Sequence, residues 1–313
     1  MKNQIKFNFL EKMYLVRMVE EYIALKYSEN KMRCPTHLCT GQEAISAGVS
    51  EVLNKNDFVV STHRSHGHYL AKGGNLNKMI AELYGKSSGC SGGYGGSMHL
   101  IDLNVNFMGS TAIVGNSIPV GIGLGLSSKL DKSKNLTCIY FGEGSIEEGV
   151  FHEAINFAAQ KKLPILFVCE NNLYSVYSPL KHRQPKNRNI SKMINEMGVE
   201  SYYENGNDVE KVFNLTNLAS KKIRKNSKPI FLEFSTYRWR EHCGPNFDNN
   251  IGYRKVSEFK SWLKKDPINL YETKLNKQSI LNIKTKSKLL SNINKKINED
   301  FIFAENSPFP KKN

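Results

Sequence analysis

The stretch from Phe141 to Asn172 reads FGEGSIEEGVFHEAINFAAQKKLPILFVCENN, and it decides the predicted fold. An apolar run of strand type, Leu136–Phe141, leads into it, apolar residues at helical spacing come next, and Ile165–Cys169 is strand-like again. A crossover this short typically joins parallel strands, and ligands of parallel α/β sheets lie beyond the carboxyl ends of the strands. The stretch therefore predicts an α/β fold with a ligand at this edge of the sheet.

Two polar side chains follow the ends of these two predicted strands. Glu143 follows the first strand, within Gly142-Glu143-Gly144, and Asn172 follows the second. A carboxylate and an amide oxygen beside a glycine-opened helix N-terminus can together hold a hard cation and an attached phosphate. The pattern predicts a clamp for a metal ion and a diphosphate.

The same stretch resembles the thiamine-diphosphate motif, G-D-G followed later by N-N, in the form found in α subunits of 2-oxo acid dehydrogenase E1 components. The resemblance extends to Glu153-Ala154 inside the helix and to Leu163-Pro164 before the second strand. One residue differs, because Glu143 stands where the family has aspartate. The resemblance implies a thiamine-diphosphate-binding fold, with a mainly parallel central sheet flanked by helices and a helical C-terminal segment.

This resemblance also implies the cofactors thiamine diphosphate and Mg²⁺. The implied metal ligands are Glu143, Asn172 and the carbonyl of Tyr174. The implied cofactor-binding residues are His63, Arg64, Ala112, Val114, Gly142, Glu143, Gly144, Ser145, Asn172, Tyr174, Arg238 and His242.

Length and composition indicate a globular protein. The chain has 313 residues, of which 40% are hydrophobic, which is ordinary for a globular core. We expect one E1 α-type domain over residues 1–313, with an N-terminal helix in residues 1–35 and a helical segment in residues 255–313. No window approaches the roughly 18 consecutive apolar residues of a membrane span, and the N-terminus lacks a signal peptide's apolar core. The predicted location is cytoplasmic, with no membrane partner.

The cysteines and the net charge limit the kinds of site that the sequence predicts. None of the six cysteines forms a C-x-x-C pair, which favours reduced thiols over disulfides or a zinc site. The net charge of +15 is concentrated in a Lys/Asn-rich C-terminal third that lacks interleaved aromatic residues and any nucleic-acid motif. A solvated basic face, open to an acidic partner, is therefore favoured over a nucleic-acid site.

Three histidines and one arginine lie within residues 63–68, after a predicted strand at Asp57–Ser61. Their spacing fits no closed zinc site with cysteine support, whereas an arginine beside imidazoles suits an anionic ligand. The segment resembles the family's R-x-H-G, which implies that Arg64 contacts the diphosphate and that His66 lies near the cofactor. His63 stands where relatives often have tyrosine.

Two further segments resemble the family pattern. Residues 36–49 resemble H-x-x-x-G-Q-E-A, which draws attention to His37 and Glu43, and Thr40 is predicted to cap the helix that begins there. The glycine-rich residues 85–99 resemble G-C-x-x-G-x-G-G-S-M-H, which makes His99 a catalytic or substrate-orienting candidate. The alternative for His99 is a buried, hydrogen-bonded histidine.

Residues 109–126 contain Gly121-x-Gly123-x-Gly125, whose spacing does not fit a dinucleotide fingerprint. Small residues on a closely packed helix are the preferred interpretation. The resemblance implies that main-chain groups at Ala112 and Val114 contact the aminopyrimidine of the cofactor.

The segment from Thr236 to Asp248 comes directly after a predicted strand at Pro229–Phe234. Arg238 and His242 match the family's Y-R-x-x-G-H-S, but residues 243–248 differ from the family pattern for the rest of this loop. This difference leaves the substrate and the acyl acceptor open. Cys243 is interpreted as a free thiol and not as a nucleophile.

The candidate catalytic residues are His66, His99 and His242, which are suited to proton transfer or to orienting a carboxylate. The resemblance implies an α subunit that cleaves a 2-oxo acid or an acetoin-like ketone and passes the acyl unit to an acceptor such as a lipoyl group. The implied partners are a β subunit in an α₂β₂ heterotetramer and a lipoyl acyltransferase. The alternatives are a thiamine-diphosphate-dependent carboligase, a sugar-modifying enzyme without a lipoyl partner, and a catalytically silent binding subunit.

Overall fold

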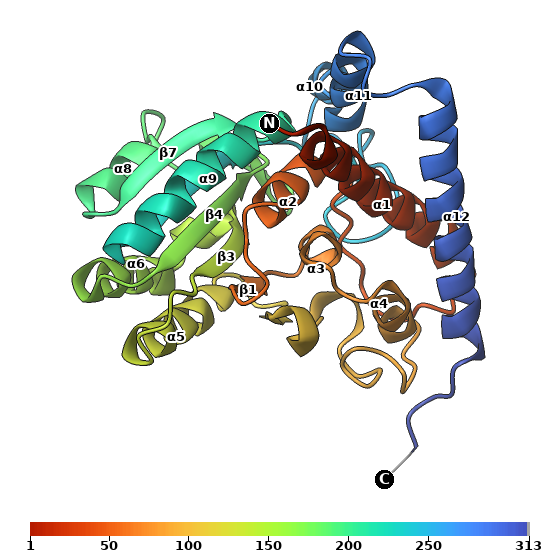
Figure 1. Ribbon diagram of the computed structural model, residues 1–313, viewed down its shortest axis with the longest axis horizontal. Helices are drawn as coiled ribbons and strands as arrows, with labels where there is room; N and C mark the ends of the chain where they lie inside the picture. The colour runs from red at the N-terminus through yellow and green to blue at the C-terminus, as the bar shows by residue number, and fades with distance from the viewer. Residues whose placement is uncertain (312–313) are drawn as a thin grey trace.

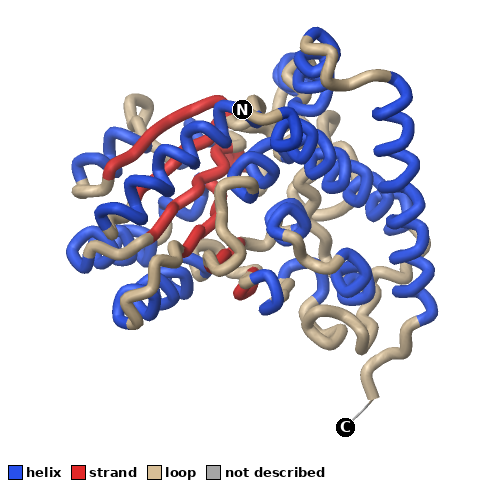
Figure 2. The backbone as a smooth tube through the Cα atoms, in the orientation of Figure 1, coloured by secondary structure: helices blue, strands red, loops and turns tan. Residues whose placement is uncertain are grey.

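A six-stranded parallel sheet forms the centre of the computed structural model, which describes residues 1–311. The strand order is β2-β1-β3-β4-β8-β7, and every neighbouring pair is parallel. Figure 2 shows these strands between layers of helix. The strands are β1 (Phe58–Ser61), β2 (Phe107–Ser110), β3 (Thr137–Gly142), β4 (Ile165–Asn171), β7 (Glu200–Asn205) and β8 (Ile230–Ser235), with a small antiparallel pair, β5 (Tyr174–Ser175) and β6 (Ser178–Pro179). The predicted parallel α/β fold is confirmed.

Helices cover both faces of the sheet (Figure 1). The α-helices are α1 (Asn3–Tyr27), α2 (Glu43–Ser50), α3 (His66–Lys72), α4 (Leu76–Leu83), α5 (Ser117–Leu130), α6 (Gly149–Lys161), α7 (Leu180–Arg183), α8 (Ile190–Glu196), α9 (Val209–Asn226), α10 (Val256–Leu263), α11 (Pro267–Lys277) and α12 (Ile283–Asn306). Three short 3₁₀ helices are η1 (Gly96–Met98), η2 (Leu103–Val105) and η3 (Glu143–Glu147). The predicted helical C-terminal segment is present, and α12 packs along α1 and α4.

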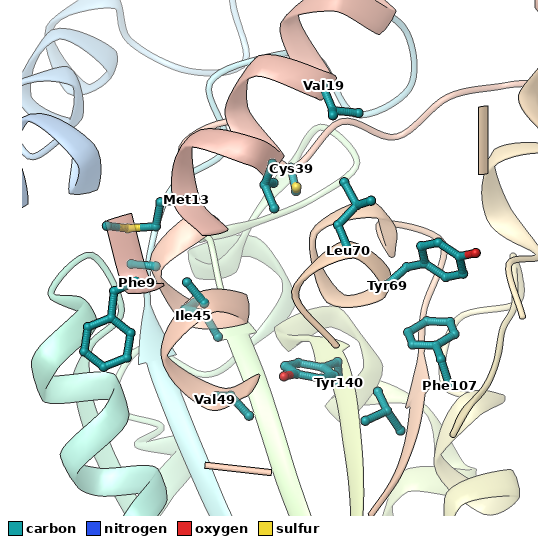
Figure 3. Packing of buried hydrophobic residues seen from close by; sticks show 14 of the residues in the cluster. Phe9, Met13, Val19, Cys39, Ile45, Val49, Tyr69, Leu70, Phe107 and Tyr140 are labelled. Atoms are coloured by element: carbon teal, nitrogen blue, oxygen red, sulfur yellow. The ribbon is translucent and has the colours of Figure 1, made fainter. Parts of the chain in front are cut away.

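Alternate residues of the central strands enter two separate apolar cores. In β3, Cys138 and Tyr140 pack with α1, α2, α3 and α9, whereas Ile139 and Phe141 pack with α5, α6 and α8. Figure 3 shows the first core, with Tyr140 beneath the helices that carry Ile45 and Tyr69. A parallel strand that is buried on both faces is apolar throughout, which explains why β3 and β4 were recognisable in the sequence.

Helix α5 packs unusually closely on the sheet because of its glycines. A Cβ atom on Gly121 would lie 2.5 Å from Ile139 Cδ1, and one on Gly125 would lie 2.1 Å from Ile165 Cδ1. At Gly123, on the opposite side of the helix, such a Cβ would have no atom of residues 1–311 within 4 Å. The expected role in close packing is confirmed for Gly121 and Gly125 and is wrong for Gly123.

The predicted strand, loop, helix, strand unit is present as β3, α6 and β4, with β3 and β4 paired directly. The glycines after β3 open the short helix η3 instead of α6, which begins only at Gly149. The edge strands β2 and β7 were not predicted. The side chains of β7 are polar or only partly buried, so this strand lacks the apolar run that marks a central strand.

The predicted cap of α2 is wrong. The helix begins after Gln42, and the Thr40 hydroxyl is buried with no hydrogen-bond partner in the described part of the chain. Instead, the Glu43 carboxylate accepts a hydrogen bond from the Gly41 backbone nitrogen at 2.9 Å and forms an ion pair with Arg17. All six cysteines are free thiols. Within residues 1–311, no helix has both the length and the apolar character that crossing a bilayer requires.

Candidate active site

A cavity of about 130 Å³ lies at the carboxyl ends of β3 and β4. Segments far apart in the sequence contribute to it, including those that come after β1, β3, β4 and β8. The structure brings most of the predicted cofactor-binding residues together here. Those that line the cavity are His63, Arg64, Ala112, Val114, Gly142, Glu143, Gly144, Ser145, Asn172, Tyr174 and His242.

Two oxygen-bearing side chains lie at the adjacent ends of β3 and β4. Glu143 is only 1% exposed, and its Oε1 lies 2.6 Å from Arg183 Nη2. Burial raises the pKa of Glu143, whereas the charge and the hydrogen bond of Arg183 oppose that change. The Asn172 Oδ1 accepts a hydrogen bond from the Tyr174 backbone nitrogen at 3.2 Å, which orients the amide. These oxygens form the kind of donor set that Mg²⁺ prefers.

Arg64 supplies a buried positive charge to the same cavity. Its guanidinium donates to the carbonyl of Leu38 at 2.6 Å and to that of His242 at 3.0 Å. Within residues 1–311 it forms no ion pair with a carboxylate, although the residue is only 5% exposed. Burial, assisted by the charge of Arg238, lowers the pKa of Arg64 to about 10. An anionic ligand would supply the missing counter-charge, so a diphosphate fits this site.

Three imidazole rings meet in the cavity, and we call His37, His63 and His242 the histidine cluster. Their ring centroids are 4.6–5.3 Å apart, and the planes meet at steep angles. Burial, with a contribution from Arg64, lowers the pKa to about 2 for His37 and to about 3 for His63 and His242. The rings are therefore neutral at pH 7, and His242 does not titrate near neutrality as an unperturbed histidine would.

Buried polar groups form a series of hydrogen bonds that leads to Asn172 in the cavity. Ser61 Oγ lies 2.8 Å from His68 Nδ1, and His68 Nε2 lies 3.1 Å from Glu170 Oε1. Gln42 donates to Glu170 Oε2 at 3.3 Å and accepts from Asn172 Nδ2 at 3.1 Å. This series of hydrogen bonds fixes the rotamer of Asn172, so that the amide oxygen of Asn172 faces the Tyr174 backbone.

Glu170 and Gln42 also line the cavity, and the sequence did not single out either as a site residue. A signal for Glu170 was present, because it is a carboxylate at the end of an otherwise apolar strand run. Gln42 was marked only by its place in the motif at residues 36–49, and its role at the site depends on the approach of α2 to β4.

Three predicted site residues lie elsewhere. His66 is fully buried, with Nδ1 2.5 Å from Glu20 Oε1 and Nε2 2.8 Å from Ser97 Oγ. His99 is exposed, beside a larger hollow of about 1160 Å³, and its Nδ1 lies 2.9 Å from the Gly95 carbonyl oxygen. The alternative of a buried histidine is therefore wrong for His99.

Arg238 is the third residue outside the cavity. Its guanidinium donates at 2.7 Å to the carbonyls of Arg240 and Val176, and it lies 3.5 Å from the carboxylate of Asp248. Asp248 also pairs with Arg254 and accepts from Tyr253 at 2.5 Å. Arg238 therefore holds the loop that carries His242, and the residues after His242 that differ from the family pattern include one of its anchors.

Residues 11–313 match the family described as dehydrogenase E1 component. The pyruvate dehydrogenase E1 component subunit alpha of Rickettsia bellii is 32% identical over 298 residues, which cover 95% of this chain and 90% of that protein. The corresponding alpha subunit of Porphyra purpurea is 34% identical over 96% of this chain and 88% of its own length. The chloroplastic subunit alpha-3 of Arabidopsis thaliana is 37% identical over 96% of this chain and 71% of its own length.

Proposed function

This chain belongs to the dehydrogenase E1 component family, and we propose that it is the α subunit of a 2-oxo acid dehydrogenase that acts on pyruvate. Membership of the family implies thiamine diphosphate and Mg²⁺ as cofactors. The name shared by the similar proteins, pyruvate dehydrogenase E1 component subunit alpha, supports pyruvate as the substrate. It also favours this function over a carboligase, a sugar-modifying enzyme or a silent binding subunit.

One observation carries the proposal: a buried arginine that has no carboxylate partner among the described residues shares a cavity with a buried carboxylate and an oriented amide. Arg64 would hold the diphosphate, and Glu143, Asn172 and the Tyr174 carbonyl would hold Mg²⁺. Main-chain groups at Ala112 and Val114, which also line the cavity, would contact the aminopyrimidine.

When bound, thiamine diphosphate supplies the electron sink that decarboxylation of a 2-oxo acid requires. The residues of this chain provide binding, orientation and protons at defined atoms. His63 and His242 are neutral, so each can donate a proton from one ring nitrogen and accept at the other without first losing a charge. His66 would act through its contacts with Glu20 and Ser97, because it does not reach the cavity.

The size of the cavity supports a second subunit. A space of about 130 Å³ is smaller than the roughly 300–1,000 Å³ typical of sites for organic ligands. We propose that a β-type subunit completes the site in an α₂β₂ heterotetramer, and that a lipoyl acyltransferase accepts the acyl unit. We further propose one domain over residues 1–313. The cytoplasmic location stays a prediction, since the similar proteins include both bacterial and chloroplastic forms.

Calorimetry on the full-length chain, co-purified with its β-type subunit, tests the proposal. Thiamine diphosphate is expected to bind in the presence of Mg²⁺, and the complex is expected to decarboxylate pyruvate with an artificial electron acceptor. Arg64→Gln removes a charge-assisted contact worth about 1.5–3 kcal/mol, so its affinity for the cofactor should fall about 10- to 150-fold. The exposed residue Arg188 offers a matched control, since Arg188→Gln removes an equal charge outside the cavity. An Arg64→Gln complex that binds the cofactor as the wild type does would contradict the assignment.

A further inference from the structure

In the proposed function His63 and His242 transfer protons, but together with His37 they also have the composition of a metal site. One nitrogen from each of His37, His63 and His242 lies within 4.8 Å of the other two. The three residues come from separate segments, before α2, after β1 and after β8, so the fold itself brings them together. We propose that the cluster binds a divalent transition-metal ion such as Zn²⁺, at a site distinct from the magnesium ligands at Glu143 and Asn172.

The donor atoms decide the class of ion. Three imidazole nitrogens suit Zn²⁺, Cu²⁺ or Ni²⁺, whereas Mg²⁺ prefers oxygen ligands. Three histidines with one open position are also a known arrangement for zinc. Zn–N bonds are about 2.0–2.1 Å long, so the nitrogens must approach one another more closely than 4.8 Å. His63 and His242 are only partly buried, and metal binding requires their rings to turn toward His37.

The hydrogen bonds around the cluster leave nitrogen lone pairs available. The Nδ1 atom of His37, a residue that is only 6% exposed, is buried and has no hydrogen-bond partner within residues 1–311. His63 Nδ1 lies 3.0 Å from the Thr62 hydroxyl, which orients the ring and leaves Nε2 free. The Arg64 guanidinium makes its shorter bond to the His242 backbone carbonyl, at 3.0 Å, and lies 3.4 Å from His242 Nδ1. The tautomer of His242 is therefore not fixed by a strong hydrogen bond.

The neutral histidine rings favour binding of a metal ion, whereas the positive charge of Arg64 opposes it. The rings are neutral at pH 7, so a metal ion need not displace a proton from an imidazolium. The positive charge of Arg64 opposes a second cation. An anion in the open fourth position, such as chloride, would lie near this guanidinium and offset the repulsion. Binding should therefore be tighter in chloride than in a buffer whose anion is too large to enter.

Occupancy of the cluster has a consequence for the cavity. The three rings line the same space as Arg64 and Glu143, so an ion held there would obstruct it. Zn²⁺ is therefore expected to inhibit the assembled enzyme, and a chelator is expected to reverse the inhibition. Excess Mg²⁺ should not protect the enzyme, because the two ions use different ligands.

The test measures metal binding directly and needs neither substrate nor thiamine diphosphate, so its failure is distinguishable from failure of the proposed function. Untagged, full-length protein is titrated with Zn²⁺ by calorimetry and with Co²⁺ by its visible absorption, which reports tetrahedral coordination. His63→Phe keeps a ring but removes the nitrogen donors, and His242→Asn provides a second variant. His152→Gln is the matched control, because His152 is exposed on α6, outside the cluster. Thermal melting establishes that each variant is folded.

The expected result is one Zn²⁺ per chain and a tetrahedral Co²⁺ spectrum. Mutation of a residue that hydrogen-bonds to a metal ligand typically lowers metal affinity 10- to 100-fold, so loss of a ligand itself should lower it further. His63→Phe and His242→Asn should therefore each weaken Zn²⁺ binding by at least about 100-fold, while His152→Gln keeps the wild-type affinity. Wild-type protein that binds no Co²⁺ in tetrahedral geometry, or folded cluster variants that bind Zn²⁺ with unchanged affinity, would overturn the proposal.

Discussion

Replacing Gly125 by alanine tests how closely α5 lies on the sheet that positions the site. The new Cβ would lie 2.1 Å from Ile165 Cδ1 and 3.1 Å from Ile165 Cγ1. Ile165 is fully buried, so its side chain cannot move aside without disturbing the core. Overpacking of this kind costs typically 1–3 kcal/mol, and so short a contact belongs at the upper end. Alanine regains about 1 kcal/mol of helix propensity, which leaves a net loss of about 2 kcal/mol.

Gly123 provides the control on the same helix. It is exposed, and an alanine Cβ there meets no atom within 4 Å, so Gly123→Ala should stabilise the chain by up to about 1 kcal/mol. The two variants should therefore differ by about 3 kcal/mol, or about 6 °C in thermal melting at roughly 2 °C per kcal/mol for a chain of this size. Ile165→Val removes Cδ1 and should rescue Gly125→Ala, since the double variant no longer has the 2.1 Å contact. Equal melting temperatures for the two alanine variants would refute the close approach of α5.

Two further predictions concern buried carboxylates. Arg183→Gln removes the cation that opposes the rise in the pKa of Glu143, so the pKa of Glu143 should rise further. As the pH falls, the variant should therefore lose Mg²⁺-dependent cofactor binding at a higher pH than the wild type does. Calorimetry between pH 5.5 and 8 checks this prediction, and identical pH profiles for the two proteins would contradict it. Burial raises the pKa of Glu233, so the ionised form destabilises the fold increasingly as pH rises above about 4.5. Glu233→Gln can keep the hydrogen bonds to Asn171 and Ser191 and carries no charge, so its melting temperature should exceed that of the wild type at pH 7. This difference in melting temperature should become smaller toward pH 4.5. A difference that stays constant with pH would exclude ionisation of Glu233 as the cause.

The sequence predicted the central strands because burial on both faces leaves an unbroken apolar run, as in β3 and β4. Glu143 and Asn172 stood out because they follow these two runs, within Gly142-Glu143-Gly144 and Asn171-Asn172. The edge strand β7 was missed, since its polar residues carry no such pattern. Local pattern thus locates the centre of the sheet and the residues that come directly after it.

Closely spaced histidines show where local pattern fails. The helix α3 begins at His66, so His63 and Arg64 precede it and face the cavity, whereas His66 turns toward Glu20 and Ser97 in the interior. The motif gives the spacing of these residues but not the point at which the backbone turns helical. Partners from other segments, such as Glu20, decide that orientation, and they are invisible to a motif.

The register of β4 connects the apolar core to the composition of the site. Leu166 and Val168 pack on the side of α2 and α3, and Glu170 and Asn172 follow at the same two-residue interval. Glu170 therefore reaches His68 on α3 and Gln42 at the start of α2, and Asn172 reaches Gln42 as well. A slip of one residue would turn Leu166 and Val168 toward α5 and α6 and would carry both polar groups away from their partners. Apolar residues that touch no ligand thus determine which face of the sheet receives the carboxylate and the amide, so core substitutions in β4 should be judged by their effect on register as well as on volume.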